Sequence, residues 1–212
     1  MGQVIRAARY DRAANESNAV SSLTFLGRAM KWHRLDDGVM GGQSETILSE
    51  AHEQGSTSSD ELHFTGQINT QGGGFCSIRS PIEEGLPSNT SAIRVRYVGD
   101  GKTYKVLFSD GSPSAFGPSR RSPSWQYDLP TKEGVEETTT IRLDLLTPSL
   151  QGGAVETDMK LDPTKVQQIG FMLSLKLSSG ASNPVETFGC GIFPFSLKVR
   201  SIEIVSADEI AR

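Results

Sequence analysis

Short runs in which apolar and polar residues alternate recur along most of this chain, separated by clusters of Gly, Pro, Ser and Asp. A period of two places one face of an extended segment in a core and the other in water, whereas a helix needs a period of 3.6. Roughly eight or nine such strands, with almost no helical periodicity, predict an all-β fold, either a β-sandwich or a jelly roll. The clearest runs are residues 62–68, 93–97, 104–108, 125–129, 141–145, 169–175 and 193–199.

Three local patterns add detail to this all-β prediction. The triplet at residues 99–101 (Gly-Asp-Gly) predicts a hairpin that joins the strands on its two sides. After Val199 the alternation resumes one residue out of step at Ile202, which predicts a β-bulge. Residues 23–32 fit either a short helix or an extended lead-in, and Gly27 weakens the helix.

The length of 212 residues fits one large β domain, and 22% charged residues fit a soluble globular protein. We expect an N-terminal arm over residues 1–22, the sandwich over 23–207 and a C-terminal tail over 208–212. The sequence contains no apolar run of about eighteen residues, so it predicts no transmembrane helix.

The net charge of −4 argues against a general surface for nucleic acid or anionic membranes. Cys76 and Cys190 lie in apolar, strand-like runs, so both are predicted to be buried free thiols in a reducing compartment. Three arginines in residues 1–12 are compatible with the remnant of an organelle-targeting segment. Myristoylation is disfavoured because Arg6 replaces the usual Ser or Thr.

The densest feature is the stretch from residue 32 to residue 44 (WHRLDDGVMGGQS). Glycine pairs allow positive φ or a close backbone approach, and Asp side chains fix tight loops by accepting from nearby amides. The stretch therefore predicts a structured loop before the first strand, and we also expect it to bind a partner. The predicted contact residues are Trp32, Asp36, Asp37, Met40, Gly41 and Gly42.

Arginines provide the other predicted contacts. Arg79 lies on a strand face that we expect to be polar. Arg120 and Arg121 lie in a Pro- and Ser-rich loop beside Ser122, where phosphorylation would change the local charge strongly. These features favour a protein that binds another protein.

No catalytic, metal or cofactor site is predicted. His33, His52 and His63 lack metal-ligand spacing, and a calcium site built on the Asp pair is a minor alternative. The triplet at residues 72–74 (Gly-Gly-Gly) precedes a strand rather than a helix, so it has no helix dipole for phosphate. Cys76 fits a buried structural thiol better than a nucleophile, and the chain has no Gly-x-Ser-x-Gly elbow.

The stretch at residues 37–44 (Asp-Gly-Val-Met-Gly-Gly-x-Ser) after Trp32 resembles the signature of the complex I intermediate-associated protein 30 family. The resemblance covers roughly residues 30–205, and the order and spacing of its motifs are more specific than any one motif. Further motifs of that family follow in order at residues 64–68, 72–79, 98–104, 125, 169–171 and 193–205.

The chain departs from the family pattern at two places. Asp36 stands where the family usually has Asn, and Gln151-Gly152 stands near a usual Arg-Gly. Both departures are compatible with a divergent branch that has a different partner.

The resemblance implies a galactose-binding-type sandwich and a non-catalytic assembly factor, or chaperone, for the membrane arm of respiratory complex I. The implied partners are protein subunits of a membrane electron-transfer complex, with peripheral membrane association only through them. The implied location is a mitochondrion or a plastid, and the cytoplasm stays open.

Three other functions remain open at this point. One is a stable accessory subunit of a respiratory or photosynthetic complex. A carbohydrate-binding module would need exposed aromatics, for which Trp125 and Tyr127 are candidates although their spacing suits the core. An enzyme has the least support and would have to use His63 or Cys76.

Overall fold

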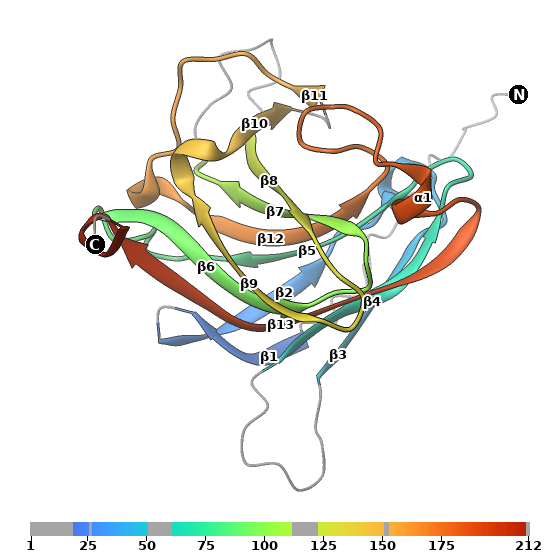
Figure 1. The fold of residues 1–212 in the computed structure, drawn as a ribbon, viewed down its shortest axis with the longest axis horizontal. Coiled ribbons are helices and arrows are strands. Elements are labelled where there is room, and N and C mark those ends of the chain that lie inside the picture. Colours follow the sequence, from blue (N-terminus) through green and yellow to red (C-terminus); the bar gives the residue numbers. More distant parts are fainter. Residues whose placement is uncertain (1–18, 26, 51–60, 112–122, 151–152, 211–212) are drawn as a thin grey trace, which may run out of the picture.

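The structure is a computed structural model that describes residues 19–25, 27–50, 61–111, 123–150 and 153–210. Two antiparallel sheets pack face to face (Figure 1). The strand order of the eight-stranded sheet is β1 (Ala19–Phe25), β2 (Arg28–Arg34), β5 (Phe75–Pro81), β12 (Gln168–Ser174), β7 (Thr103–Ser109), β8 (Ser124–Pro130), β10 (Thr147–Leu150) and β11 (Gly153–Ala154). The strand order of the five-stranded sheet is β3 (Glu45–Glu50), β4 (Leu62–Asn69), β13 (Ile192–Ser206), β6 (Thr90–Val98) and β9 (Glu136–Arg142).

Only short helices connect these strands in the described residues. None of them is long and apolar enough to cross a membrane. They are η1 (Asp37–Met40), η2 (Leu143–Leu145), η3 (Pro163–Lys165), α1 (Val185–Phe188) and α2 (Ala207–Ile210).

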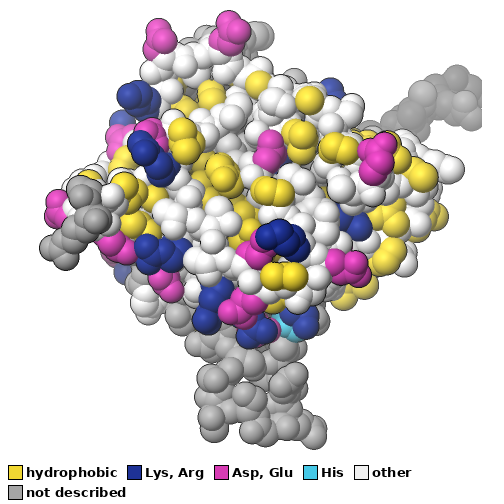
Figure 2. Space-filling view, in the orientation of Figure 1, with side chains coloured by type: hydrophobic (Ala, Val, Ile, Leu, Met, Phe, Trp, Pro, Cys, Tyr) yellow, Lys and Arg dark blue, Asp and Glu magenta, His cyan; other side chains and the backbone are white. Residues whose placement is uncertain are grey.

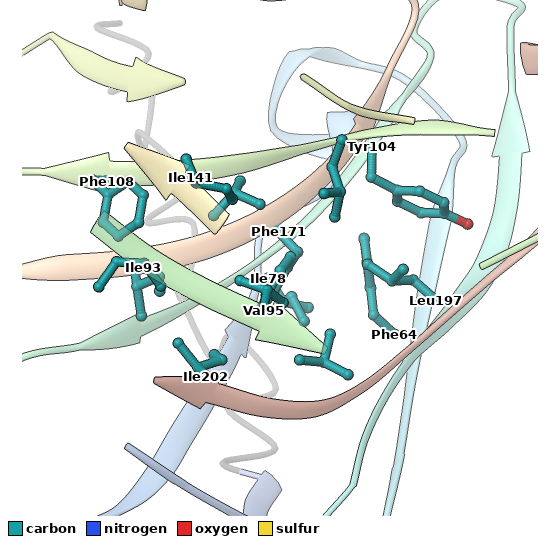
Figure 3. Close-up of a cluster of buried hydrophobic side chains, with 14 of the residues drawn as sticks. Phe64, Ile78, Ile93, Val95, Tyr104, Phe108, Ile141, Phe171, Leu197 and Ile202 are labelled. Carbon is teal, nitrogen blue, oxygen red and sulfur yellow. The ribbon is translucent and has the colours of Figure 1, made fainter. Parts of the chain in front are cut away.

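The core lies between the two sheets and is built from the apolar side of each alternating strand. Figure 3 shows Phe64 and Leu197 of the five-stranded sheet close to Tyr104 and Phe171 of the eight-stranded sheet. The rings of Phe64 and Phe195 meet edge to face with centroids 4.8 Å apart. The predicted all-β sandwich is confirmed.

The hairpin predicted at residues 99–101 is wrong. β6 belongs to the five-stranded sheet and β7 to the eight-stranded sheet, so the turn crosses between layers. The Asp100 carboxylate holds this crossing by accepting from the Tyr104 hydroxyl at 2.9 Å and from the Ser196 backbone N–H, also at 2.9 Å. A Gly-Asp-Gly triplet specifies a tight turn but not the sheet that receives the next strand.

Four other local predictions are settled by the structure. The bulge is confirmed, because the register of β13 against β6 shifts between Val199 and Ser201. Residues 28–32 lie in β2, so the extended alternative holds over that part. The last alternating residues of the 141–145 run form η2 rather than a strand. Cys76 is buried as expected, but Cys190 is exposed.

The ends of the chain differ in detail from the expected arm and tail. β1 begins at Ala19 and pairs with β2, so it takes in the last residues of the expected arm. α2 begins at Ala207, one residue before the expected tail.

Candidate functional site

One buried carboxylate joins the two glycine-rich motifs of the sequence. Asp37, at the start of η1, is fully buried. Its carboxylate accepts from the Ser44 backbone N–H at 2.9 Å and from the Ser44 hydroxyl at 2.6 Å. It also accepts from the backbone N–H groups of Gly74 at 2.6 Å and Phe75 at 3.3 Å. The loop of residues 36–44 is thereby fastened to the segment of residues 72–75.

The neighbouring glycines make room for this carboxylate. A Cβ atom on Gly42 would lie 2.2 Å from Asp37 Cγ, and a Cβ atom on Gly73 would lie 2.2 Å from Asp37 Oδ2. Gly41 has φ of 89°, in the left-handed region that favours glycine. The glycines predicted as partner contacts therefore have a clear structural role.

The hydrogen bonds keep Asp37 ionised. Burial by itself would raise the pKa of this carboxyl group, but the bonds from Ser44, Gly74 and Phe75 outweigh burial and hold the pKa below its usual value. Four hydrogen bonds to the buried carboxylate compensate for the cost of removing its charge from water.

Asp36 fixes the other end of the loop. One of its oxygens accepts from the Thr46 backbone N–H at 2.9 Å, and the other accepts from the Thr46 hydroxyl. An Asn has only one side-chain oxygen, so it cannot accept both bonds in this geometry. Asp36 therefore joins the loop to the first residues of β3 through both of its carboxylate oxygens.

Burial revises the predicted contact set. Trp32 is fully buried, with its ring 5.8 Å from that of Phe171, and Asp37 is equally buried. Both side chains pack beneath the loop on its core side, and neither has exposed surface that a partner could contact. Met40, in contrast, is 78% exposed, and its neighbour Val39 is 69% exposed.

Exposed apolar side chains gather where this loop meets other loops at one end of the sandwich. The loop end containing η1 lies beside the turn after β12, because the Leu175 backbone N–H donates to the Gly74 carbonyl at 3.0 Å. Reciprocal bonds between Thr70 and Gly191 bring the start of β13 to the same end. We call this surface the loop-end patch; it comprises Leu35, Val39, Met40, Leu175, Val185 and Ile192.

Figure 2 shows hydrophobic side chains along this end of the molecule, on the right of the view, where Figure 1 places α1. Apolar side chains that are exposed together, on loops fixed by buried hydrogen bonds, are typical of a protein-binding surface. Met40 is the most exposed residue of the patch, and its flexible side chain can adapt to the surface of a partner.

The predicted arginines lie elsewhere. Arg79 is on the face of β5 that points away from the core, as expected from its place in the alternation. Arg120 and Arg121 lie outside the described residues.

The described residues also bear on two alternatives considered from the sequence, a calcium site and a carbohydrate-binding face. They contain no group of three or more His, Cys, Asp and Glu side chains that could hold a metal. Trp125 is buried and donates its Nε1–H to Asp110 at 3.2 Å, while Tyr127 is half-buried against the core. Neither ring is an exposed platform for a sugar.

Two solved structures with a similar fold are carbohydrate-binding modules. One is the family 11 module from Clostridium thermocellum in complex with a β-1,3-1,4-mixed-linked tetrasaccharide, with a TM-score of 0.53, 14% identity, and coverage of 83% of this chain and 89% of that one. Another is the family 11 module of a cellulosomal cellulase of the same organism, with a TM-score of 0.54, 13% identity, and coverage of 83% and 88%. At this identity the likeness establishes the fold alone.

The sequence matches a family over most of its length. No curated protein matches the chain. The model of the family described as Complex I intermediate-associated protein 30 (CIA30) matches residues 23–199. This range includes the loop of residues 36–44 and the segment of residues 72–75 that Asp37 joins. The chain belongs to the complex I intermediate-associated protein 30 family.

Proposed function

We propose that this protein is a non-catalytic assembly factor that binds unassembled protein subunits of a membrane electron-transfer complex, respiratory complex I in the first place. The observation that carries the proposal is the loop-end patch, where apolar side chains are exposed on a loop that a buried carboxylate holds in shape. Family membership supports the choice of complex I.

The size of the patch suits reversible binding. Full burial of a Val, Leu, Ile or Met side chain stabilises by about 1.5–3 kcal/mol relative to exposure, so covering six partly exposed ones contributes about 5–10 kcal/mol. Association itself costs about 4–15 kcal/mol. The patch alone therefore gives a weak complex, as a factor that leaves after assembly requires.

The proposed location follows from the proposed partner. The protein works in the organelle that builds the complex, a mitochondrion or a plastid, and associates with the membrane through its protein partners. A stable accessory subunit would use the same surface but stay in the finished complex.

The test is affinity capture of the tagged protein from its own cells in mild detergent, followed by native electrophoresis and mass spectrometry. We expect subunits of a partly built complex. Co-migration with the finished, active complex would assign an accessory subunit instead. A free protein without membrane-complex subunits would contradict the proposal, and a glycan array would then test the carbohydrate-binding alternative.

A matched pair of variants tests the surface. V39S/M40S removes the two most exposed apolar side chains of the patch, whereas L145S changes a leucine in η2 that is 61% exposed and lies outside the patch. We expect V39S/M40S to lose most of the captured subunits and L145S to keep them, with both variants within about 0.5 kcal/mol of the wild type in stability. Equal capture by the two variants would rule out the patch as the contact surface.

A further inference from the structure

Two cations on the outer face of the eight-stranded sheet have no hydrogen-bonded partner among the described residues. Lys105 in β7 is only 3% exposed. Arg79 in β5 has a shielded Nε atom without a hydrogen-bond acceptor. Within the described part of the chain, neither side chain has a hydrogen bond or an ion pair. A cation removed from water without compensation is costly, so the pair calls for an explanation.

The register of the sheet brings these two side chains toward each other. Arg79 pairs with Gly170 of β12, and Gly170 pairs with Leu107 of β7. A Cβ atom on Gly170 would lie 2.5 Å from Arg79 Cδ, so the arginine side chain lies over this glycine. Lys105 is two residues from Leu107 and lies on the same face of the sheet. The positive charge of Arg79 lowers the pKa of Lys105, so the two charges are close enough to interact. Gly170 thus leaves the space through which Arg79 crosses β12 toward Lys105.

Polar groups of β8 border the same place. Gln126 pairs with Leu107 and is 5% exposed, and its Oε1 atom has no hydrogen-bond partner. Asp128 pairs with Lys105, but its carboxylate accepts from the Ser178 backbone N–H at 2.9 Å and the Ser178 hydroxyl at 2.7 Å. The one nearby acid that the register supplies is therefore used to hold a loop.

The positive charge at this place exceeds the negative charge. The pKa of Lys105 is lowered to about 8, mainly because of burial and also because of the positive charge of Arg79, while the Asp128 carboxylate opposes the shift. Burial also lowers the pKa of Arg79 to about 10. An anion placed between the two cations would remove this penalty.

We propose that the outer face of β5, β12, β7 and β8 binds an oxyanion, a carboxylate or phosphate group, between the Arg79 guanidinium and the Lys105 ammonium. The guanidinium offers a planar fork that matches such a group, and the ammonium adds a point charge. The unpartnered Oε1 atom of Gln126 can accept a hydrogen bond that a hydroxyl group of the ligand donates. Because Lys105 is only 3% exposed, the proposed ligand presents a single carboxylate or phosphate group rather than a bulky one.

The same chemistry has two sources, a free small anion or a glutamate side chain of a protein. The proposal does not depend on the assembly function. The probes are therefore inorganic phosphate, malate, and a capped tripeptide with a central glutamate, each titrated into the full chain. The readout is the NMR signal of the Lys105 ε-methylene, complemented by calorimetry.

We expect at least one probe to give saturable binding and to raise the pKa of Lys105 toward its ordinary value. Saturation by phosphate or malate assigns a free anion, and saturation by the tripeptide alone assigns a protein carboxylate. K105M and R79M should each weaken binding about tenfold or more, and K132M, at an exposed lysine paired with Glu137, should not. If no probe shifts the wild-type Lys105 signal, or if K105M binds as tightly as the wild type, the proposal is overturned. The wild-type titration decides the matter even if a variant fails to fold.

Discussion

At the scale of single residues, Asp37 connects parts of the chain that are far apart in sequence. Its carboxylate accepts from Ser44 on one side and from Gly74 and Phe75 on the other. Because the group is buried, each donor would be left without a partner if the carboxylate were removed.

We expect Asp37→Asn to lower the free energy of unfolding by about 3 kcal/mol, because the amide NH₂ would face backbone donors. Urea denaturation measures the change. Asp144→Asn is the control, since Asp144 pairs with Arg142 at the surface. If D37N and D144N have the same urea midpoint, the hydrogen bonds to the Asp37 carboxylate contribute no stability.

The same carboxylate predicts how stability depends on pH. The folded-state pKa of Asp37 lies below the unfolded value, so its contribution is full above about pH 4 and is lost as the pH falls through the folded pKa. Stability measured between pH 6 and the acid limit should therefore fall less steeply in D37N than in the wild type. Parallel curves would mean that Asp37 has the same pKa in both states.

At the scale of elements, η1 and the segment before β5 form one unit whose glycines are fitted around the carboxylate. Gly73 faces Asp37 at a distance that leaves no room for a Cβ atom. Gly38, in the same unit, has open space around it. The two glycines thus differ in what a methyl group would meet.

We expect Gly73→Ala to destabilise the protein by about 2 kcal/mol, within the usual cost of overpacking, and to weaken partner capture by moving Val39 and Met40. Gly38→Ala should have little effect on either. Thermal unfolding and the capture assay measure both consequences. If the two alanine variants behave alike, the close packing around Asp37 does not shape the loop.

At the scale of the whole molecule, the two sheets are joined by polar contacts at the crossing as well as by the core. Asp100 lies in the turn from β6 to β7 and accepts from Tyr104 of one sheet and Ser196 of the other. The crossing therefore fixes the position of one layer relative to the other.

We expect Asp100→Ala to lower the free energy of unfolding by about 2–3 kcal/mol, since the Tyr104 hydroxyl and the Ser196 N–H lose a charged acceptor. Tyr104→Phe, which removes only the hydroxyl, should cost less. Chemical denaturation followed by two probes tests whether unfolding stays two-state. A D100A variant as stable as the wild type would show that packing alone aligns the sheets.

The sequence by itself determined the fold class and the strand faces, because alternation reports which side of each strand is apolar. The positions of Phe64, Tyr104 and Phe171 in the core follow from that period. It also identified the loop around Asp37 as special, since glycines and aspartates in such density suit no regular element.

Only the tertiary structure decided which segments meet. Asp37 lies against Gly73, and the Arg79 side chain lies over Gly170, although each pair is far apart in the chain. Similarly, β6 and β7 follow one another in the chain but belong to different sheets. Burial of Trp32 and exposure of Met40 follow from the same packing. Local periodicity reports the side of a strand, but contacts between distant segments depend on how strands are ordered in a sheet, which no local pattern encodes.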